Sequence, residues 1–312
     1  MVVERLMLSA KFVAHSKKIN SLCFSNQGKL IASSSEDKSI KVWHPKQDKL
    51  IDTVTFKSVE ANSIVFSQDD QILISAEENS TLKLRSLQTK EIIHTLIGHQ
   101  KAVNSVAIHP KNKLIASGSD DKTVKLWALE SGKQVCTLTG HEDNVLAVAF
   151  SPDGKVLASS GDINDKIIKL WFLSENKSIT LTGHSDWFGG VYSVAFSPDS
   201  KLIASGSKDK TIKVWQVNTG REIMTLKGHE DDITSLAISA DNILASASKD
   251  KTLKLWELAT GKLISTITHQ QKIRTVAYTP DGQILAIGCS GGDIKLFQPQ
   301  SRSHNLLHEF LS

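Results

Sequence analysis

Histidine, serine, aspartate and tryptophan recur together along the chain at nearly constant offsets. A histidine, a hydroxyl and a carboxylate in one unit are the residue types of nucleophilic acyl transfer, in which histidine takes the proton of serine. The set occurs in five places: His15, Ser33, Asp37 and Trp43; His99, Ser117, Asp121 and Trp127; His141, Ser159, Asp165 and Trp171; His184, Ser205, Asp209 and Trp215; His229, Ser246, Asp250 and Trp256. An enzyme needs one such site, so five copies favour a structural role, and we predict no catalytic residue.

The set belongs to a longer repeat. The phrase GHQKAVNSVAI begins at Gly98, and close copies begin at Gly140 and Gly228. Looser copies divide the rest of the chain at the same spacing. The resulting units are 14–55, 56–97, 98–139, 140–182, 183–227, 228–267 and 268–312.

Each unit shows the pattern of four short strands. Alternating apolar residues at 103–108 indicate a first strand, and an SPDGK-type turn leads to a buried run such as 202–205. A tight turn precedes a third strand at 211–215, and a fourth follows at 221–226. Short strands with regular turns and no helical period indicate an all-β fold. Four strands in about 40–45 residues predict a seven-bladed β-propeller with four-stranded antiparallel blades.

The repeats resemble those of the WD-repeat family, in the regular style of bacterial and cyanobacterial-type proteins. Gly-His near the start of the clearest units and Trp at the end of the third strand carry the likeness, which covers nearly all of 1–312. The Asp that follows this Trp in the family is absent here. The resemblance implies that each set forms an internal hydrogen-bond chain from Trp through Ser and His to Asp, which satisfies polar groups between packed sheets.

Two units lack the set. The second has Lys57, Ser75, Asn79 and Arg85 at the four places, and the seventh has His269, Ile287, Gly291 and Phe297. Tolerated drift explains both units, and it is the interpretation we favour. The alternative is that the two blades use these positions for contacts.

Composition excludes several classes of function. The net charge of +4 is mild and the lysines are spread evenly around the repeats, which argues against nucleic acid as a partner. The histidines are mostly repeat markers, so no metal or other cofactor is expected. No apolar run is long enough for a membrane span. The three cysteines lie in no metal or redox spacing, which favours a reducing, cytoplasmic location. We expect the isolated chain to be a monomer.

A rigid disc with variable loops suits recognition, because the cost of ordering the surface is already met. We therefore predict a scaffold or adaptor that binds a protein or peptide on its upper face, over the mouth of the central channel. Two alternatives remain. The chain is a sensor or regulatory domain cut from a larger signalling protein, or an enzyme with a site in the channel, for which no converging residues are evident.

A propeller must complete its last blade across the chain ends, or it leaves an open sheet edge. The seventh unit supplies three strands ending near Phe297. Either 6–13 or 305–311 lies at the right distance to supply the fourth. The habit of the family favours the N-terminal segment, so we predict that residues 1–13 hold the closing strand.

The resemblance also implies which residues face the upper surface. One set precedes the aspartate of the tight turn: Glu36, Glu78, Asp120, Asn164, Lys208, Lys249 and Ser290. The other begins the first strands: Asn20, Asn62, Asn104, Leu146, Tyr192, Thr234 and Arg274. Glu36 and Asp120 make the early blades acidic, whereas the later blades contribute bases. Such a divided face would orient a dipolar partner. Lys18 and Asp232 run against the division.

Two insertions interrupt the repeat, at 161–166 and at 184–196. The topology of the family places both loops on the upper face, side by side. The second brings Trp187 and Phe188, followed by two glycines and then Tyr192. Large aromatic side chains on a loop are typical anchors of an interface. We predict that they contact a partner. The alternative is that Trp187 caps the edge of the blade.

Overall fold

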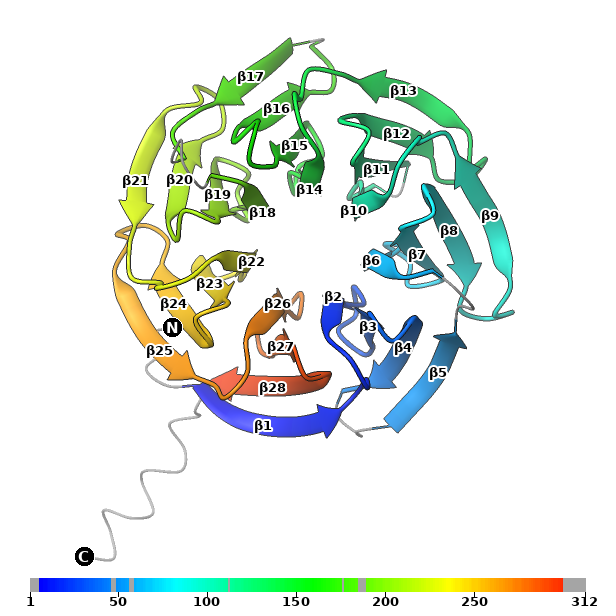
Figure 1. The fold of residues 1–312 in the computed structure, drawn as a ribbon, viewed down its shortest axis with the longest axis horizontal. Coiled ribbons are helices and arrows are strands. Elements are labelled where there is room, and N and C mark those ends of the chain that lie inside the picture. Colours follow the sequence, from blue (N-terminus) through cyan, green and yellow to red (C-terminus); the bar gives the residue numbers. More distant parts are fainter. Residues whose placement is uncertain are drawn as a thin grey trace, which may run out of the picture.

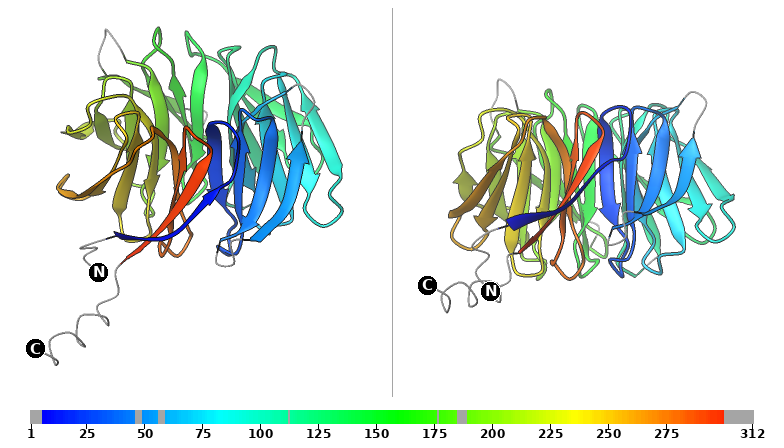
Figure 2. Two further views of the ribbon diagram at one scale, coloured as in Figure 1. Left: turned by 60° about the horizontal axis from the view of Figure 1, so that its bottom comes forward. Right: turned by 90° about the horizontal axis from the view of Figure 1, so that it is seen from below.

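The computed structural model describes residues 6–45, 49–55, 59–111, 113–175, 177–184 and 189–299. Seven four-stranded antiparallel sheets stand around a central channel, as Figure 1 shows. Seen from the side, the sheets form a disc (Figure 2). We number the blades by the seven sequence units. This confirms the predicted fold class.

The strands of each blade run in order from the channel to the rim. The first strands are β2 Ile19–Phe24, β6 Ala61–Phe66, β10 Val103–Ile108, β14 Val145–Phe150, β18 Val191–Phe196, β22 Ile233–Ile238 and β26 Ile273–Tyr278. The second strands are β3 Ile31–Ser35, β7 Ile72–Glu77, β11 Leu114–Ser119, β15 Val156–Gly161, β19 Leu202–Ser207, β23 Ile243–Ser248 and β27 Leu285–Cys289. The third strands are β4 Ser39–His44, β8 Thr81–Ser86, β12 Val124–Ala128, β16 Ile168–Phe172, β20 Ile212–Gln216, β24 Thr252–Glu257 and β28 Asp293–Pro299. The fourth strands are β5 Lys49–Thr55, β9 Ile92–Ile97, β13 Gln134–Leu138, β17 Lys177–Leu181, β21 Glu222–Leu226, β25 Leu263–Thr268 and β1 Leu6–Val13.

The core lies between neighbouring blades. Trp127 of blade 3, for example, belongs to one apolar cluster with Ile74 and Leu84 of blade 2. The second strands are buried on both faces and consist largely of small residues, which lets adjacent sheets approach closely. A Cβ added at Gly118 would lie 2.6 Å from the side chain of Val145 in the next blade. The small residues of these strands are therefore required by the spacing of the blades.

The N-terminal segment closes the ring. Strand β1 pairs antiparallel with β28, from Leu6 opposite Pro299 to Val13 opposite Asp293. Figures 1 and 2 show β1 as the outer strand of blade 7. The pairing covers the edge that β28 would otherwise expose. The prediction of an N-terminal closing strand is thus confirmed, and the alternative segment 305–311 lies outside the described residues.

Candidate functional site at the channel mouth

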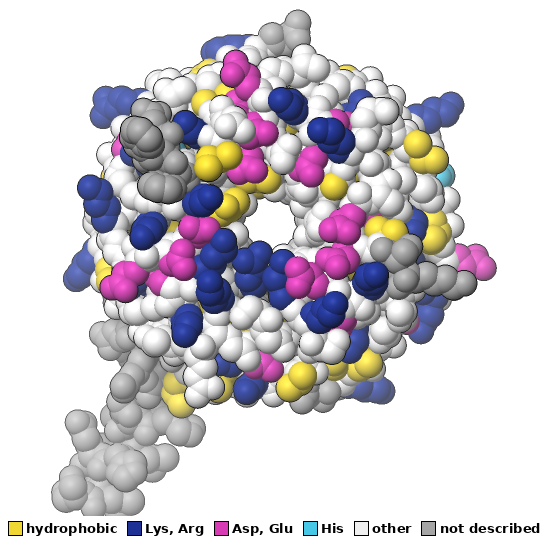
Figure 3. Space-filling model, viewed as in Figure 1, with side chains coloured by type: hydrophobic (Ala, Val, Ile, Leu, Met, Phe, Trp, Pro, Cys, Tyr) yellow, Lys and Arg dark blue, Asp and Glu magenta, His cyan; other side chains and the backbone are white. Residues whose placement is uncertain are grey.

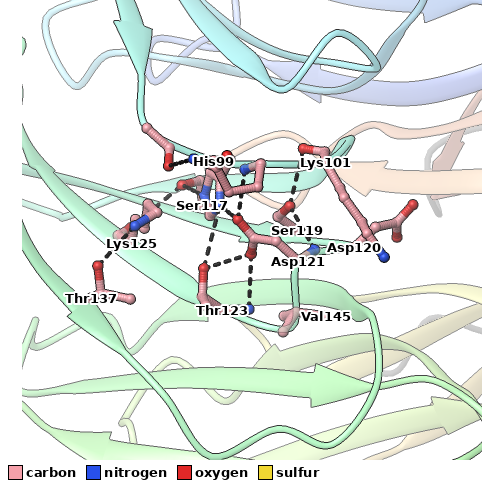
Figure 4. A network of polar contacts seen from close by, with 12 residues as sticks. His99, Lys101, Ser117, Ser119, Asp120, Asp121, Thr123, Lys125, Thr137 and Val145 are labelled. Atoms are coloured by element: carbon pink, nitrogen blue, oxygen red, sulfur yellow. Dashed lines mark hydrogen bonds and ion pairs between the residues drawn. The ribbon is translucent and has the colours of Figure 1, made fainter.

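The recurring histidines form hydrogen-bond chains inside the blades. In blade 3 the indole Nε1 of Trp127 donates to Ser117 Oγ at 2.8 Å, and Ser117 Oγ lies 2.7 Å from His99 Nε2. His99 Nδ1 is 2.8 Å from Asp121 Oδ2, and the carboxylate also accepts from Thr123 (Figure 4). The three contacts from tryptophan through serine and histidine to aspartate also occur in blades 4, 5 and 6. The threonine contact recurs in blades 5 and 6.

Burial sets the protonation of these chains. Burial lowers the pKa of His99 and His15, although the aspartate beside each acts in the opposite direction. Burial alone would raise the pKa of Asp121, but hydrogen bonds from Thr123, the Gln100 amide and His99 hold it at about 2. At neutral pH the histidine is therefore uncharged. It donates a hydrogen bond to the aspartate through Nδ1 and accepts a hydrogen bond from the serine hydroxyl at Nε2. The serine hydroxyl is committed inside the blade, which suits a structural role.

Blade 1 departs from the prediction at Trp43. Its Nε1 is buried and has no hydrogen-bond partner among the described residues, whereas His15 still contacts Ser33 and Asp37. In three other blades a glycine precedes the histidine, and a Cβ there would crowd the tryptophan ring; these are Gly98, Gly183 and Gly228. Blade 1 has Ala14 instead, and the Phe12 ring packs 5.0 Å from Trp43. Both side chains belong to the same apolar cluster as Trp43.

Blades 2 and 7 hold different polar groups. In blade 2 the fully buried Glu77 pairs with Lys83 at 3.0 Å and accepts from Ser75 and Asn79. Arg85 stands at the strand position of the tryptophan, and its guanidinium lies 3.8 Å from Asp52 Oδ2. Lys57 lies outside the described residues. In blade 7, Lys295 Nζ lies 3.0 Å from His269 Nδ1, and the Phe297 ring stands where other blades have tryptophan.

A cavity of about 330 Å³ opens at the upper mouth of the channel. It is lined by Lys18, Lys249 and one residue from each first strand: Asn20, Asn62, Asn104, Leu146, Tyr192, Thr234 and Arg274. Each of the seven is the second residue of its strand. In every blade the pairing of the first and second strands shifts at this residue, as in a β-bulge. A bulge redirects the side chain at that point, here into the channel.

Most of these side chains tie one blade to the next. Asn62 donates to the Val103 carbonyl at 3.1 Å, and Asn20, Asn104 and Thr234 make the corresponding bond. In blade 4 the second residue is Leu146, which cannot donate, and Ser160 Oγ of the second strand bonds to the next blade instead. Among the described residues, Tyr192 and Arg274 make no bond of this kind.

The tight turns are held by a second repeated contact. The backbone N–H of the residue before the turn aspartate donates to the carbonyl two residues before the cavity-lining position, as Glu36 does to Lys18. In blade 4 this donor is Asp162 and not Asn164, because the extra residues of the insertion follow it. Asn164 instead binds the carboxylate of Asp143. The sequence assignment of Asn164 to this position was therefore wrong, and blade 4 gains an acid on the upper face.

Ion pairs sharpen the charge division of this face. Lys18 pairs with Glu36 at 2.5 Å, and Lys249 pairs with Asp232 at 2.7 Å, so blades 1 and 6 are largely neutralised. The residue that donates the repeated backbone bond and the residue that accepts it are charged in several other blades. The acids at these two positions that are outside those ion pairs belong to blades 2 to 4; they are Glu60, Glu78, Asp120 and Asp162. The bases outside those ion pairs belong to blades 5 and 7. They are Lys208 and Lys272 at the same two positions, and Arg274 in the cavity lining. Figure 3 shows Lys and Arg side chains gathered on the rim of the mouth over β22 and β26, and Asp and Glu over β6.

Arg274 is the group at the mouth with unused bonding capacity. Its Nε is buried and has no hydrogen-bond partner among the described residues. Burial lowers the pKa of Arg274, against the effect of Glu36, Tyr192 and Asp232. Tyr192 lies beside it on the cavity wall, with Lys249 Nζ 5.7 Å from its ring centroid. Burial and the carboxylates of Asp232 and Asp162 raise the pKa of Tyr192, so its hydroxyl stays neutral.

The structure brings together part of the set expected to bind a partner. Tyr192, Lys249 and Arg274 line one cavity. Glu36 accepts a hydrogen bond from the lining residue Lys18, and Asp120 accepts one from the lining residue Asn104. Lys208 lies on the same face but not in the cavity lining. Trp187 and Phe188 lie outside the described residues. Sequence reasoning missed the bulge that turns the second residue of each first strand into the channel, although the Asn-Ser pair repeated in blades 1 to 3 was a visible signal.

Other site types were sought in the described part of the chain. No three His, Cys, Asp or Glu side chains are grouped there so as to hold a metal ion. Within the same ranges no helix has the length and apolar character needed to cross a membrane. Cys23, Cys136 and Cys289 are all free thiols.

Comparison with known families agrees with this architecture. A family model described as the second beta-propeller of TEP-1 matches residues 69–284, which is more than half of the chain. A second model, described as the WD domain, G-beta repeat, matches residues 7–44. No curated protein shows a significant match. Because these matches coincide with seven four-stranded blades and their His–Ser–Asp chains, the protein belongs to the WD-repeat β-propeller family.

Proposed function

We propose that this propeller is a scaffold that binds a protein or peptide over the upper mouth of its channel. The observation that carries the proposal is the cavity of about 330 Å³ whose wall takes one side chain from every blade. Sites of this kind are concave and largely preformed, and rigid walls reduce the entropy lost on binding. Tyr192 and Arg274 are not used to join the blades, so they remain able to contact a partner. We assign no catalytic residue.

The divided charge supports a dipolar partner. Acids of blades 2 to 4 face bases of blades 5 and 7 across the mouth, and complementary charge speeds encounter more than it raises affinity. Lys249 is a poor residue for testing this, because a glutamate there would face Asp232, its present partner. Lys208 and Lys272 carry the surplus charge and are the residues to change.

Trp187 and Phe188 stay in the proposal as anchors for the partner. In the sequence they lie between blades 4 and 5, shortly before Gly190 and Tyr192. Replacing both aromatic residues with alanine should weaken partner binding by about 2 kcal/mol or more, as expected for a hot spot, with little loss of stability. A loss of about 3–5 kcal/mol in unfolding free energy would show that they are core residues.

The same proposal includes a cytoplasmic location and a monomeric state, and light scattering of the purified chain tests the monomeric state. The three free thiols are consistent with a reducing compartment. A sensor domain of a larger signalling protein would use the same face, so that alternative differs in context and not in site.

Quantitative capture from a native lysate tests the function. The Lys208→Glu, Lys272→Glu variant should lose proteins that the wild type retains. The matched control is Lys155→Glu, Lys201→Glu, which changes two lysines of the turns that join first to second strands, with side chains 76% and 81% exposed. Equal capture by both variants and the wild type would exclude the upper face as the binding surface.

A further inference from the structure

We propose that the channel mouth receives an anionic group carried by a peptide, a carboxylate or a phosphate, which pairs with Arg274 and lies against Tyr192. This inference rests on the proposed function and gives it a ligand chemistry. Both anions offer two oxygens at a spacing that the planar guanidinium can bind through two parallel hydrogen bonds.

The first argument is that Arg274 is a cation without an anion. Its Nε is buried and unbonded, and no carboxylate of the described residues lies within ion-pair distance of its guanidinium. A partly buried charge that lacks a partner is costly, and the cost ends when an anion arrives. At the same strand position, Asn62 and Thr234 donate hydrogen bonds to carbonyls of the neighbouring blade, whereas Arg274 makes no such bond among the described residues.

The second argument is the sign of the charge around the cavity. Its charged lining residues are Lys18, Lys249 and Arg274, and no carboxylate lines it. Lys18 and Lys249 are paired with Glu36 and Asp232, which are not lining residues. An entering anion therefore meets no acid on the wall, and Arg274 is the lining cation whose charge is not shared in an ion pair with a described residue.

The third argument concerns the size and character of the wall. About 330 Å³ is at the lower end of the range for small-ligand pockets, enough for one or two side chains but not for a folded element. Tyr192 and Leu146 supply an apolar surface on the same wall as the cations. An anionic head on a short carbon stem fits this combination.

Fluorescence anisotropy with a fluorescein-labelled hexaglutamate peptide tests the inference on the full chain. Arg274→Gln should weaken binding roughly tenfold or more, because one charge-assisted pair is lost. The affinity of Arg274→Lys should lie between those of the wild type and Arg274→Gln, since lysine keeps the charge but lacks the planar guanidinium. Lys155→Gln removes the same charge from a side chain 76% exposed on a distant turn and should bind like the wild type.

Competition separates the sources of the anion. An unlabelled acetylated hexaglutamate, a serine hexapeptide with one phosphoserine, and inorganic phosphate are compared at equal concentration. Displacement by either peptide at concentrations where phosphate has no effect supports a peptide-borne anion, and the stronger of the two identifies the head group. Equal displacement by inorganic phosphate overturns the peptide part of the proposal.

Equal affinity of the wild type and Arg274→Gln, or no binding by the wild type, overturns the inference. Thermal unfolding of Arg274→Gln without peptide shows whether the variant is folded; if it is not, Arg274→Lys against Lys155→Gln decides the matter. Failure here is distinct from failure of the proposed function. Loss of capture in the Lys208, Lys272 variant together with unchanged hexaglutamate binding in Arg274→Gln would keep the scaffold and reject the anion site.

Discussion

At the scale of single residues, one serine hydroxyl in each complete chain serves two buried partners. Ser117 accepts from Trp127 and donates to His99, and both partners lie between packed sheets. A buried polar group without a partner costs more than a hydrogen bond contributes. The unfolding free energy lost when the serine is removed therefore depends on how many partners it satisfies, and this number differs between blades.

We expect Ser117→Ala to lower the free energy of unfolding by about 2–5 kcal/mol, because it leaves both Trp127 and His99 unsatisfied. Ser33→Ala should cost only about 1–3 kcal/mol, since Trp43 has no bond to lose. Urea denaturation of the two variants measures the difference. Equal losses would mean that Trp43 and Ser33 are bonded in solution.

The histidines also make stability depend on pH. The folded-state pKa of His269 is lowered from 6.5 to about 4, through burial and then the charge of Lys295. The unfolded chain therefore binds more protons than the folded protein between pH 6.5 and about pH 4. The contribution of the neutral His269 to the free energy of unfolding is complete above pH 6.5 and is lost as the pH falls toward 4. His15 and His99 shift in the same direction.

Urea midpoints measured between pH 7.5 and 4.5 should decline below pH 6.5, and His269→Gln should make the decline shallower. Proton NMR of the His269 ring supplies a direct check. A titration of this ring at or above pH 6.5 would contradict the expectation.

At the scale of elements, neighbouring first strands are joined by two side chains in sequence. In blades 1, 2, 3 and 6 the second residue donates to a carbonyl of the next blade. In five blades the third residue is a serine whose Oγ accepts a backbone N–H from the next blade. Blade 4 has Leu146 and Ala147 at these places. Its junction with blade 5 therefore lacks both bonds, and only Ser160 compensates in part.

Ala147→Ser should restore one of them by accepting the backbone N–H of Val194, as Ser105 accepts that of Val148 at 3.1 Å. The expected gain is about 0.5–1.5 kcal/mol in unfolding free energy, and the converse variant Ser105→Ala should lose about 1–3 kcal/mol. Differential scanning calorimetry of both variants measures the effect. Destabilisation by Ala147→Ser would show that the junction has no room for the hydroxyl.

At the scale of the whole molecule, the ring depends on pairing between its two ends. Strand β1 contributes the buried Phe12 and covers the edge of β28. Its other side chains include Met7 and Val13, which are 54% and 71% exposed. Removing the strand therefore affects the sheet as a whole, whereas changing its exposed side chains does not.

Deletion of residues 1–12 should lower the unfolding free energy by at least about 3–5 kcal/mol, the cost of losing one buried phenylalanine, and should promote association through the exposed β28 edge. Met7→Lys with Val13→Lys keeps the pairing and should change stability by no more than about 0.5 kcal/mol. Thermal unfolding and light scattering measure both effects. An unchanged melting temperature after the deletion would show that another segment, such as 305–311, completes blade 7.

The sequence by itself determined the number of blades, their four strands and the His–Ser–Asp–Trp sets, because these features are local and repeat with the unit. The contacts of His99 with Ser117 and Asp121 lie within one blade, so their spacing along the chain is enough to predict them. Local spacing failed where an insertion moved the register, which put Asp162 in the place assigned to Asn164. It also failed at Trp43, whose indole packs against Phe12 and lacks the predicted hydrogen bond among the described residues.

Only the tertiary structure decided what lies at the mouth. The cavity joins residues as far apart as Asn20 and Arg274, which meet because the ring closes on itself. The ion pairs of Lys18 and Lys249 each lie within one blade. That Glu36 of blade 1 and Asp232 of blade 6 act on Arg274 of blade 7, whose Nε has no hydrogen-bond partner among the described residues, depends on the assembly of the ring. A repeat pattern specifies each blade alone, whereas the electrostatics of the mouth belong to all seven at once.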